Sequence, residues 1–235
     1  MKNAIVLCSG GLDSVVAAYA VRKKYANLIF LFFDYGQRAI KEEEYCVKKI
    51  AKLLNAMFLK LNLKWLGDLS NTPINKIKKF KRTTDKNLEN DDKDVLKWWV
   101  PCRNSVFLIN ALAFAESFYL NDKDKYEVII GLKNEGRIFM KDTTERFVNK
   151  FNELIKEATF HGFYKVIAPL IKLDKTEVIA LGKKLNVPFE FTYSCYVGSR
   201  FKGKIPIHCG RCLNCVLRKK GFYWSGVRDD SLYKE

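Results

Sequence analysis

Residues 5–14, Ile5-Val6-Leu7-Cys8-Ser9-Gly10-Gly11-Leu12-Asp13-Ser14, form the strongest local signal in the chain. An apolar run ends in small residues, and a pattern typical of a helix follows, which predicts a strand, a tight loop and a helix. Gly10 and Gly11 permit a positive φ and let a ligand approach the backbone closely. Residue types that cap helices flank them: Ser9, Asp13 and Ser14. Unpaired amides at a helix start suit phosphate, so we expect a phosphate-binding loop rather than a plain helix cap.

This loop differs from two common nucleotide-binding motifs. It is not of the Walker type, because no GK[ST] follows, and it lacks the third glycine of GxGxxG. Residues 9–14, SGGLDS, resemble the SGGxDS signature of the N-type ATP pyrophosphatases, or PP-loop superfamily. The resemblance implies an enzyme that transfers AMP to a carbonyl or carboxylate and releases pyrophosphate.

Length and charge narrow the class of protein. A chain of 235 residues predicts one compact domain with a small appendage. We find no apolar run of about 18 residues, and the chain enters a strand at once, so we expect no membrane span and no signal peptide. The expected location is the cytoplasm. The net charge of +16 predicts attraction to nucleotides, phosphorylated substrates or RNA; a solvated, Lys-rich surface is the alternative.

Strand and helix signals alternate along the chain. Strands are predicted at 3–7, 28–33, 56–61, 126–131 and 164–167, and helices at 12–24, 41–54, 105–119, from Thr143 or Thr144 to 158, and 175–185. This alternation predicts an α/β fold with a doubly wound parallel sheet. Ligands bind such sheets at the carboxyl ends of the strands. Residues 9–11 and 34–38 should therefore share one crevice.

Residues 64–99 are rich in Lys, Asn and Asp and predict a long mobile connection with one short helix at 92–98. A segment of this length is either a lid that closes over the substrate or an insertion without a role, and we favour the lid. Residues 191–228 contain no acidic residue. We therefore assign 1–190 to an ATP pyrophosphatase domain and 191–235 to a C-terminal region.

Cysteines are concentrated in the C-terminal region. Cys209, Cys212 and Cys215 are spaced as overlapping C-x2-C pairs, and Cys195 precedes them. A tetrahedral structural zinc site with four thiolates fits this spacing. An iron–sulfur cluster or a reactive thiol pair is the alternative, and His208 could replace one ligand. The other cysteines are expected in the core (Cys8 and Cys46) or beside the site (Cys102).

Six stretches together resemble the 7-cyano-7-deazaguanine synthase family of queuosine and archaeosine biosynthesis. They are SGGLDS (9–14), FDYGQR (33–38), VPCRNSVFLINALAFAE (100–116), APLIKLDKTEVIALG (168–182), TYSCYVG (192–198) and CGRCLNCVLRKKGF (209–222). The resemblance implies an adenine nucleotide alpha hydrolase-like fold with a zinc-bearing tail. It also implies a ligase that converts 7-carboxy-7-deazaguanine, ammonia and ATP to 7-cyano-7-deazaguanine, by adenylation of the carboxylate and then of the amide.

Site residues follow from the same resemblance. Pyrophosphate and ATP would bind at Leu7, Cys8, Ser9, Gly10, Gly11, Leu12, Asp13, Ser14 and Asp34, the last through metal or ribose, with Mg²⁺ neutralising the phosphates. The predicted catalytic residues are Asp13, Ser14 and Arg38. The carboxylate and purine edge would contact Arg38, Arg103 and Asn104, and the ring would contact Asp142. Zinc would be held by Cys195, Cys209, Cys212 and Cys215.

Two rival functions use the same motifs differently. A thiolase-like PP-loop enzyme would adenylate a tRNA base and hold the RNA phosphates with the basic tail. A non-catalytic zinc module would bind nucleic acid, but such a module has no need of an ATP loop. For the synthase we expect small-molecule substrates and no stable nucleic-acid or membrane partner. The chain could form a homodimer.

Overall fold

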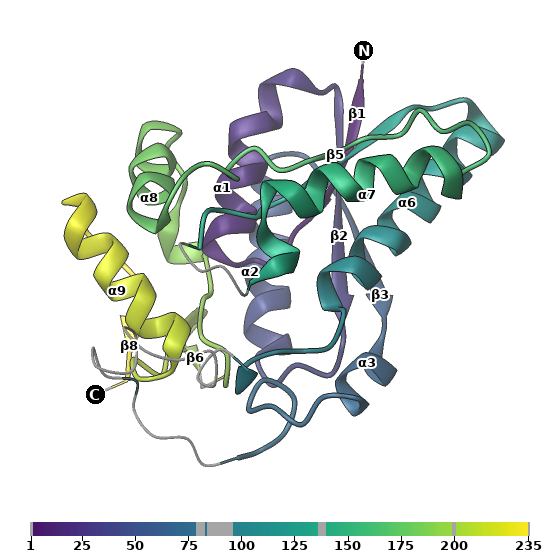
Figure 1. Cartoon of the computed structure of the whole chain (residues 1–235). Helices are drawn as coiled ribbons and strands as arrows, with labels where there is room; N and C mark the ends of the chain where they lie inside the picture. Colours follow the sequence, from purple (N-terminus) through teal and green to yellow (C-terminus); the bar gives the residue numbers. More distant parts are fainter. Residues whose placement is uncertain (1, 79–82, 84–95, 136–139, 199–200, 235) are drawn as a thin grey trace.

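A five-stranded parallel sheet in the order β3-β2-β1-β4-β5 lies at the centre of the computed structural model (Figure 1). The structure describes residues 2–78, 83, 96–135, 140–198 and 201–234. The strands are β1 Asn3–Leu7, β2 Asn27–Asp34, β3 Met57–Asn62, β4 Tyr126–Ile130 and β5 Val166–Ile167. β1 pairs in parallel with both β2 and β4, which makes it the central strand.

Helices cover both faces of this sheet. On one face lie α1 Leu12–Val21, α2 Ile40–Leu53 and α8 Lys175–Lys184. On the other lie α6 Arg103–Asp122 and α7 Glu145–Ala158. Short 3-10 turns occur at Arg22–Lys24, Lys141–Thr143 and Phe189–Phe191. The two layers of helices confirm the doubly wound α/β fold.

The alternation of side chains along β1 explains the two layers. Ala4 and Val6 point into the core beneath α1 and α2, while Ile5 and Leu7 point into the core beneath α6 and α7. All the residues of β1 are buried. A strand that is buried on both faces has a continuous run of apolar residues, and this run is why a strand could be predicted at 3–7.

Most predicted elements are found within a few residues of their expected bounds, with three corrections. The fifth strand is confined to Val166–Ile167. The N-cap of α1 is Gly11, with no side-chain cap, because the hydroxyl of Ser14 bonds inside the loop. The helix predicted at 105–119 is longer at both ends and spans Arg103–Asp122, with Ile109 on an exposed side. Thr144 caps α7, at one of the two predicted starts, and Asp174 caps α8.

The first part of the 64–99 segment is ordered, which corrects the prediction of a mobile connection throughout. Residues Lys64–Asp68 form helix α3. Leu66 and Ile74 are buried in the core beneath α6, because apolar residues interrupt the charged ones. The predicted helix at 92–98 lies largely outside the described residues, so the lid stays a prediction.

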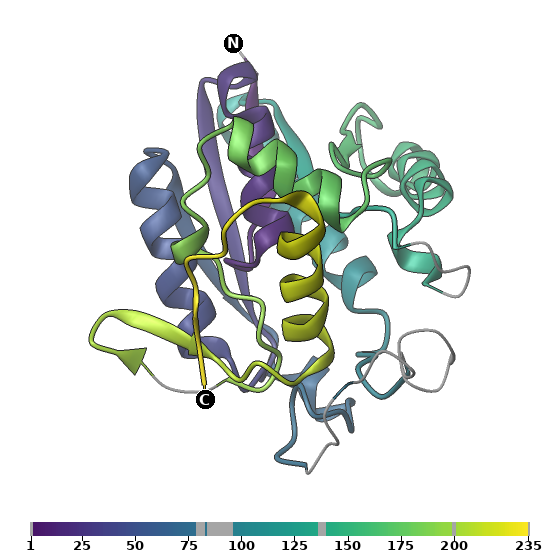
Figure 2. The same ribbon diagram turned by 90° about the vertical axis from the view of Figure 1, so that its left-hand side faces the viewer.

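The C-terminal region packs against the sheet domain. It contains β6 Phe201–Lys202, β7 Ile205–His208, α9 Leu213–Ser225 and β8 Leu232–Tyr233. The strands form a second sheet in the order β6-β7-β8. Figure 2 shows α9 below α8 and the β6–β7 hairpin beside α2, where Phe201 and Tyr45 are in edge contact. The region therefore extends the layer that already carries α1, α2 and α8.

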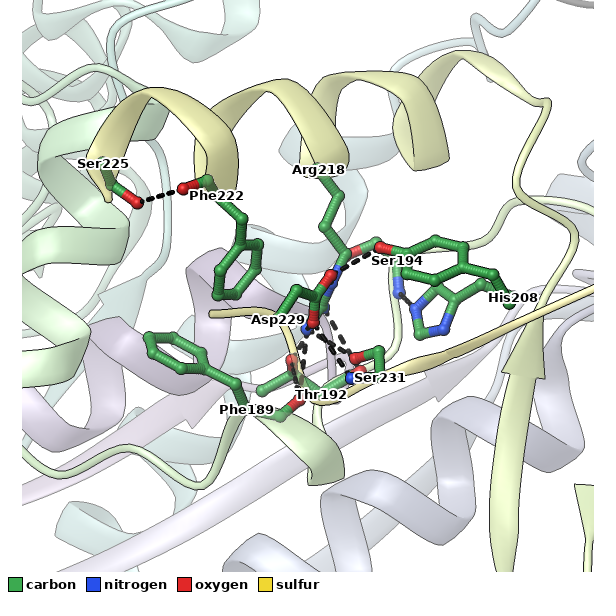
Figure 3. Close-up of polar contacts among 10 residues, drawn as sticks. Phe189, Thr192, Ser194, His208, Arg218, Phe222, Ser225, Asp229 and Ser231 are labelled. Atoms are coloured by element: carbon green, nitrogen blue, oxygen red, sulfur yellow. Dashed lines mark hydrogen bonds and ion pairs between the residues drawn. The ribbon is translucent and has the colours of Figure 1, made fainter. Parts of the chain in front are cut away.

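The guanidinium of Arg218 on α9 is the polar centre of this region (Figure 3). Nε and Nη2 donate to both carboxylate oxygens of Asp229, at 2.9 and 3.0 Å. The other contacts reach Phe189 O, the hydroxyls of Thr192, Ser194 and Ser231, and Thr192 O. Burial opposes ionisation of Asp229, but Arg218 outweighs it and lowers the pKa of Asp229 to about 2. A buried charge is tolerated here because every N–H group has a partner.

Substituting Arg218 by Met should therefore destabilise the chain strongly. The change leaves Asp229 buried without its counter-charge, and breaking a buried pair costs about 3–5 kcal/mol. Urea denaturation of Arg218→Met and of the unaltered chain measures the loss. Arg228→Met is the matched control, because that side chain is 89% exposed beside Asp230 and its pair is worth less than about 1 kcal/mol. Equal losses in the two variants would contradict the central role of Arg218.

Candidate active site

The loop between β1 and α1 is held by its own hydroxyl groups. Gly11 N donates to Ser9 Oγ at 3.2 Å, and Ser14 Oγ donates to Gly11 O at 3.0 Å. The two serine oxygens lie 3.3 Å apart. These bonds fix the loop while the first amides of α1 have no partner within the helix. The loop thus presents donors and the positive end of a helix dipole to an anion.

Close approach of the chain on both sides explains two glycines at this loop. Gly10 has a φ of +73°, and a Cβ there would lie 2.7 Å from the backbone oxygen of Glu43 on α2. A Cβ on Gly131, directly after β4, would lie 2.7 Å from Ser14 Cα. Any side chain at either position would push α2 or β4 away from the loop.

An ion pair joins this loop to α8. Lys175 Nζ lies 2.8 Å from both carboxylate oxygens of Asp13. Lys175 is the first residue of α8, so that helix brings a cation to the anion-binding end of α1. Its side chain is 16% exposed and reaches the cavity beside the loop.

A cavity of about 290 Å³ opens beside the loop. Its walls include most of the predicted site: Leu7, Cys8, Ser9, Gly11, Leu12, Asp13, Ser14, Arg103, Asn104 and Asp142. These residues come from β1, α1, α6 and the segment before α7. The carboxyl ends of β1 and β4 thus meet at one site, as the parallel sheet predicts.

Aromatic rings surround Arg103 at one end of the cavity. The Arg103 guanidinium lies 5.8 Å from the centre of the Tyr35 ring. Phe107 stacks on Phe33 at 4.1 Å, and Trp98 lies 5.2 Å from Tyr196. Burial raises the pKa of Tyr35 to about 12, against the opposing charge of Arg103, so its hydroxyl is neutral. This end suits a planar ring that carries a negative group.

Asp142 lies at the same end of the cavity. Asn104 Nδ2 donates to the main-chain oxygen of Asp142 at 3.2 Å, which links α6 to the turn before α7. Burial raises the pKa of Asp142, and the charge of Arg103 opposes that shift. The Oδ1 atom of Asp142 is buried and has no hydrogen-bond partner among the described residues. An unpaired buried acceptor is costly, so this atom is suited to accept a hydrogen bond from a ligand.

Glu43 and Gln37 form a second polar pair in the cavity wall. Gln37 Nε2 donates to Glu43 Oε2 and to Phe33 O, both at 2.9 Å. Gln37 Oε1 accepts from Tyr35 N at 2.9 Å, which fixes the amide. Burial raises the pKa of Glu43 to about 8, against the hydrogen bond from Gln37 and the charge of Arg103. Glu43 can therefore hold or release a proton near neutral pH.

Asp34 and Arg38 do not line the cavity. Alternation along β2 turns Asp34 to the side opposite Phe33, where it accepts from Gly36 N and lies 3.7 Å from Lys60 Nζ. The guanidinium of Arg38 donates to Pro73 O at 3.3 Å. The crevice expected for residues 34–38 thus contains Tyr35 and Gln37 instead. The binding roles of Asp34 and Arg38 stay predictions.

Four cysteines come together in the C-terminal region. The ligand atoms of Cys195, Cys209, Cys212 and Cys215 all lie within 4.8 Å of one another. Cys209 N donates to Cys195 Sγ at 3.4 Å, and Cys212 N donates to Cys209 Sγ at 3.3 Å. Four thiols at these distances can bind a tetrahedral metal ion.

His208 is not part of this cluster, which excludes the alternative ligand set. Its Nε2 accepts from Ser194 N at 3.0 Å, and its ring lies between Tyr193 and Tyr233. The remaining cysteines are separate from this cluster. Cys8 and Cys46 are buried, and Cys102 is exposed.

Two charged residues of the cavity wall, Lys175 and Glu43, were not identified as site residues from the sequence. Lys175 was interpreted only as a helix start, although it lies in one of the stretches that carried the resemblance. Glu43 was given no role, because only the apolar positions of the predicted helix 41–54 were considered. Its spacing to Cys46, Val47 and Ile50 is i, i+3, i+4 and i+7, which places it on the buried face of α2. A carboxylate at a buried position is the signal that could have found it.

Within the part of the chain that the structure describes, no helix combines the length and apolar character needed to cross a bilayer. Among solved structures, a U34-tRNA thiolase NcsA from Methanococcus maripaludis, with its four-iron four-sulfur cluster, is 19% identical. It covers 96% of this chain and 65% of its own, with a TM-score of 0.49. An NH3-dependent NAD synthetase from Campylobacter jejuni is 17% identical over 81% of this chain and 66% of its own, with a TM-score of 0.43. Likenesses this distant add nothing to a functional assignment.

Sequence relatives are much closer. A 7-cyano-7-deazaguanine synthase from Methanosphaera stadtmanae is 33% identical over 236 residues, with 99% of each chain covered. Another, from Methanothermobacter thermautotrophicus, is 34% identical over 237 residues, with 99% of this chain and all of the relative covered. The family model described as queuosine biosynthesis protein QueC matches residues 3–226. The chain therefore belongs to the QueC family.

Proposed function

We propose that the protein is a cytoplasmic ligase that converts 7-carboxy-7-deazaguanine and ammonia to 7-cyano-7-deazaguanine with ATP. The relatives that carry this name support the proposal. One observation of the structure carries it: a phosphate-binding loop and an aromatic, cationic pocket share one cavity. An enzyme that adenylates a carboxylate on a planar base needs these two features side by side.

The loop and Lys175 would bind the departing pyrophosphate. Loop amides, the helix dipole and the Lys175 ammonium all favour negative charge at the same place. Mg²⁺, when bound with ATP, neutralises phosphate charge, and the Asp13 carboxylate offers the oxygen ligands that this ion prefers. Charge stabilisation and positioning suffice, since ammonia is the nucleophile and no protein nucleophile is needed.

The aromatic end would bind the deazaguanine ring. Arg103 offers the forked donor geometry that suits the substrate carboxylate. Tyr35 and Tyr196 offer ring faces beside it. The unpaired Oδ1 of Asp142 would accept a ring N–H group. Arg103 would thus lie between the ring and the loop.

We also propose that the metal is zinc and that its role is structural, in the region 191–235 that follows the domain 1–190. The four sulfurs leave no open coordination position, which is the mark of a structural zinc site. None of the four cysteines lines the cavity. A catalytic iron–sulfur cluster would need an open position toward the substrate.

The thiolase-like alternative lacks a suitable sulfur. Such an enzyme needs a reactive thiol or an open cluster near the ATP. Among the described residues, Cys8 is the cysteine that lines the cavity. Burial raises the pKa of Cys8 to about 11, despite hydrogen bonds from Gly10 and Ser14, so it is a poor nucleophile at neutral pH.

The purified protein incubated with 7-carboxy-7-deazaguanine, ammonium, Mg²⁺ and ATP should release the nitrile, AMP and pyrophosphate. Mass spectrometry detects the base, and chromatography measures the nucleotides. An RNA substrate tested in parallel should give no AMP. ATP binding without formation of either the amide or the nitrile would refute the proposal.

Replacing Asp13 by Ala should abolish turnover with little loss of fold, because the Asp13 side chain lies at the start of α1 and is 26% exposed. Lys175→Met should lower the rate of AMP formation by about 100-fold, the usual cost of one lost charge-stabilising donor. Lys172→Met is the control, because that side chain is 79% exposed. Comparable rates in the Lys175 and Lys172 variants would contradict the pyrophosphate role.

Cys212→Ser should release the metal and lower the melting temperature, since structural zinc contributes directly to folding. Elemental analysis should find one zinc and no iron per unaltered chain. Cys102→Ser should keep the metal, because Cys102 is exposed and outside the cluster. Retained zinc and an unchanged melting curve in Cys212→Ser would overturn the ligand assignment.

A further inference from the structure

The proposed reaction requires proton removal at nitrogen, and the inference below rests on that proposed function. In the first half, ammonia forms a C–N bond to the acyl adenylate, the C–O bond to AMP breaks, and one proton leaves nitrogen. In the second half, the O-adenylated amide loses its two N–H protons as the C–O bond to AMP breaks and the C≡N bond forms. Both halves therefore need a base near the reacting carbon.

Few groups in the cavity can act as that base. Among the described residues that line it there is no histidine. Two of its carboxylates are held in ion pairs: Asp13 with Lys175 at 2.8 Å, and Glu135 with Lys133 at 2.7 Å. Glu43 and Asp142 have no such cation bonded to them. The choice lies between these two.

Position favours Glu43. Its main-chain oxygen lies against Gly10, where an added Cβ would come within 2.7 Å. The phosphates bound by the loop must adjoin the reacting carbon, because that carbon is bonded through oxygen to the α-phosphate. Asp142 instead holds Asn104 through its main-chain oxygen, at the ring-binding end of the cavity. Glu43 is thus the unpaired carboxylate whose own backbone contacts the loop.

Orientation favours Glu43 as well. Gln37 donates to Oε2 and is itself fixed by Tyr35 N and Phe33 O. This arrangement immobilises one carboxylate oxygen and leaves Oε1 without a hydrogen bond among the described residues. A base needs one oxygen anchored and the other directed at the proton that it takes.

We propose that Glu43 is the catalytic base of both halves of the reaction. In the first half its Oε1 accepts the proton that ammonia loses. In the second half it accepts the protons of the imidate nitrogen in turn. After each transfer the proton passes to solvent, which regenerates the Glu43 carboxylate. AMP leaves together with the amide in the first half and with the nitrile in the second.

The groups around Glu43 keep it poised for this role. Burial raises its pKa to about 8; the hydrogen bond from Gln37 and the charge of Arg103 on α6 oppose the shift, while Glu42 and the Cys195 thiolate add to it. A base with a pKa near the working pH is the most efficient, because it both accepts and releases protons readily.

The test separates adenylation from proton removal in Glu43→Gln. Exchange of pyrophosphate into ATP, driven by 7-carboxy-7-deazaguanine without ammonia, should stay within about threefold of the unaltered enzyme, since no N–H proton leaves in that step. Conversion of the carboxamide to the nitrile with ATP should fall by about 100-fold or more. Glu44→Gln is the matched control, because Glu44 lies on the same helix but binds Lys60 and Lys48 outside the cavity.

The pH profile of the carboxamide reaction gives a second readout. Ammonia is absent from it, so its own titration does not enter. The rate in the unaltered enzyme should rise with pH through about 8, as Glu43 loses its proton, and Glu43→Gln should lack that inflection. Hydroxylamine, which is neutral at pH 7, should trap the acyl adenylate that is formed by the unaltered enzyme and by the Glu43→Gln variant.

The outcomes distinguish this inference from the proposed function. Nitrile formation by Glu43→Gln at the unaltered rate, or with the unaltered pH profile, overturns the inference and leaves the function standing. Loss of pyrophosphate exchange in proportion to nitrile formation also overturns it, because Glu43 would then serve binding. An unaltered enzyme that activates neither the carboxylate nor the amide overturns both.

Discussion

The close packing at Gly10 is the contact on which the whole site depends. The loop can turn there only because the residue has a φ of +73° and no side chain. α2 then lies directly against it through Glu43. On the other side, Gly10 O accepts a hydrogen bond from Tyr193 N at 2.8 Å, which connects the C-terminal region to the loop. Three segments far apart in the sequence are thus placed by one residue.

This packing determines what the cavity can bind. Because α2 and the 193–196 segment lie against the loop, the loop and the aromatic end are parts of one cavity. Cations from three elements line it, Arg103, Lys133 and Lys175, and the last two are balanced by acidic partners. Each of these cations can interact with an incoming anion.

Local patterns in the sequence sufficed to predict the sheet, the loop after its first strand and the cluster of four cysteines. β1 is a continuous apolar run because it is buried on both faces, and the cysteine spacing is short enough to read directly. Contacts between distant residues were beyond such patterns. Lys175 meets Asp13 across 162 positions. The pattern of residues within either segment does not predict this ion pair. The hydrogen bond from Arg218 to Thr192 could not be predicted for the same reason.

Arg38 shows a second limit of prediction from the sequence. It follows the strand end that faces the cavity, and its residue type suits a carboxylate. Yet side chains alternate beyond β2, so Tyr35 and Gln37 turn to the cavity while Asp34 and Arg38 turn away. A one-residue change in phase decides which side chains of such a loop reach the site. The sequence therefore predicted that this loop borders the cavity, but not which of its side chains point into it.

The four clustered cysteines lie beside residues of the cavity wall. Cys195 lies between Ser194 and Tyr196, both of which line the cavity, and Leu213 and Asn214 lie between Cys212 and Cys215 and line it too. A metal bound by these sulfurs would therefore fix two segments of the cavity wall without touching the substrate. Arg218 holds the same region from its other side, through Thr192 and Asp229. Among the described residues of 191–234, Arg218 is a fully buried cation that Asp229 neutralises, so the charge of this basic region does not weaken its packing against the cavity wall.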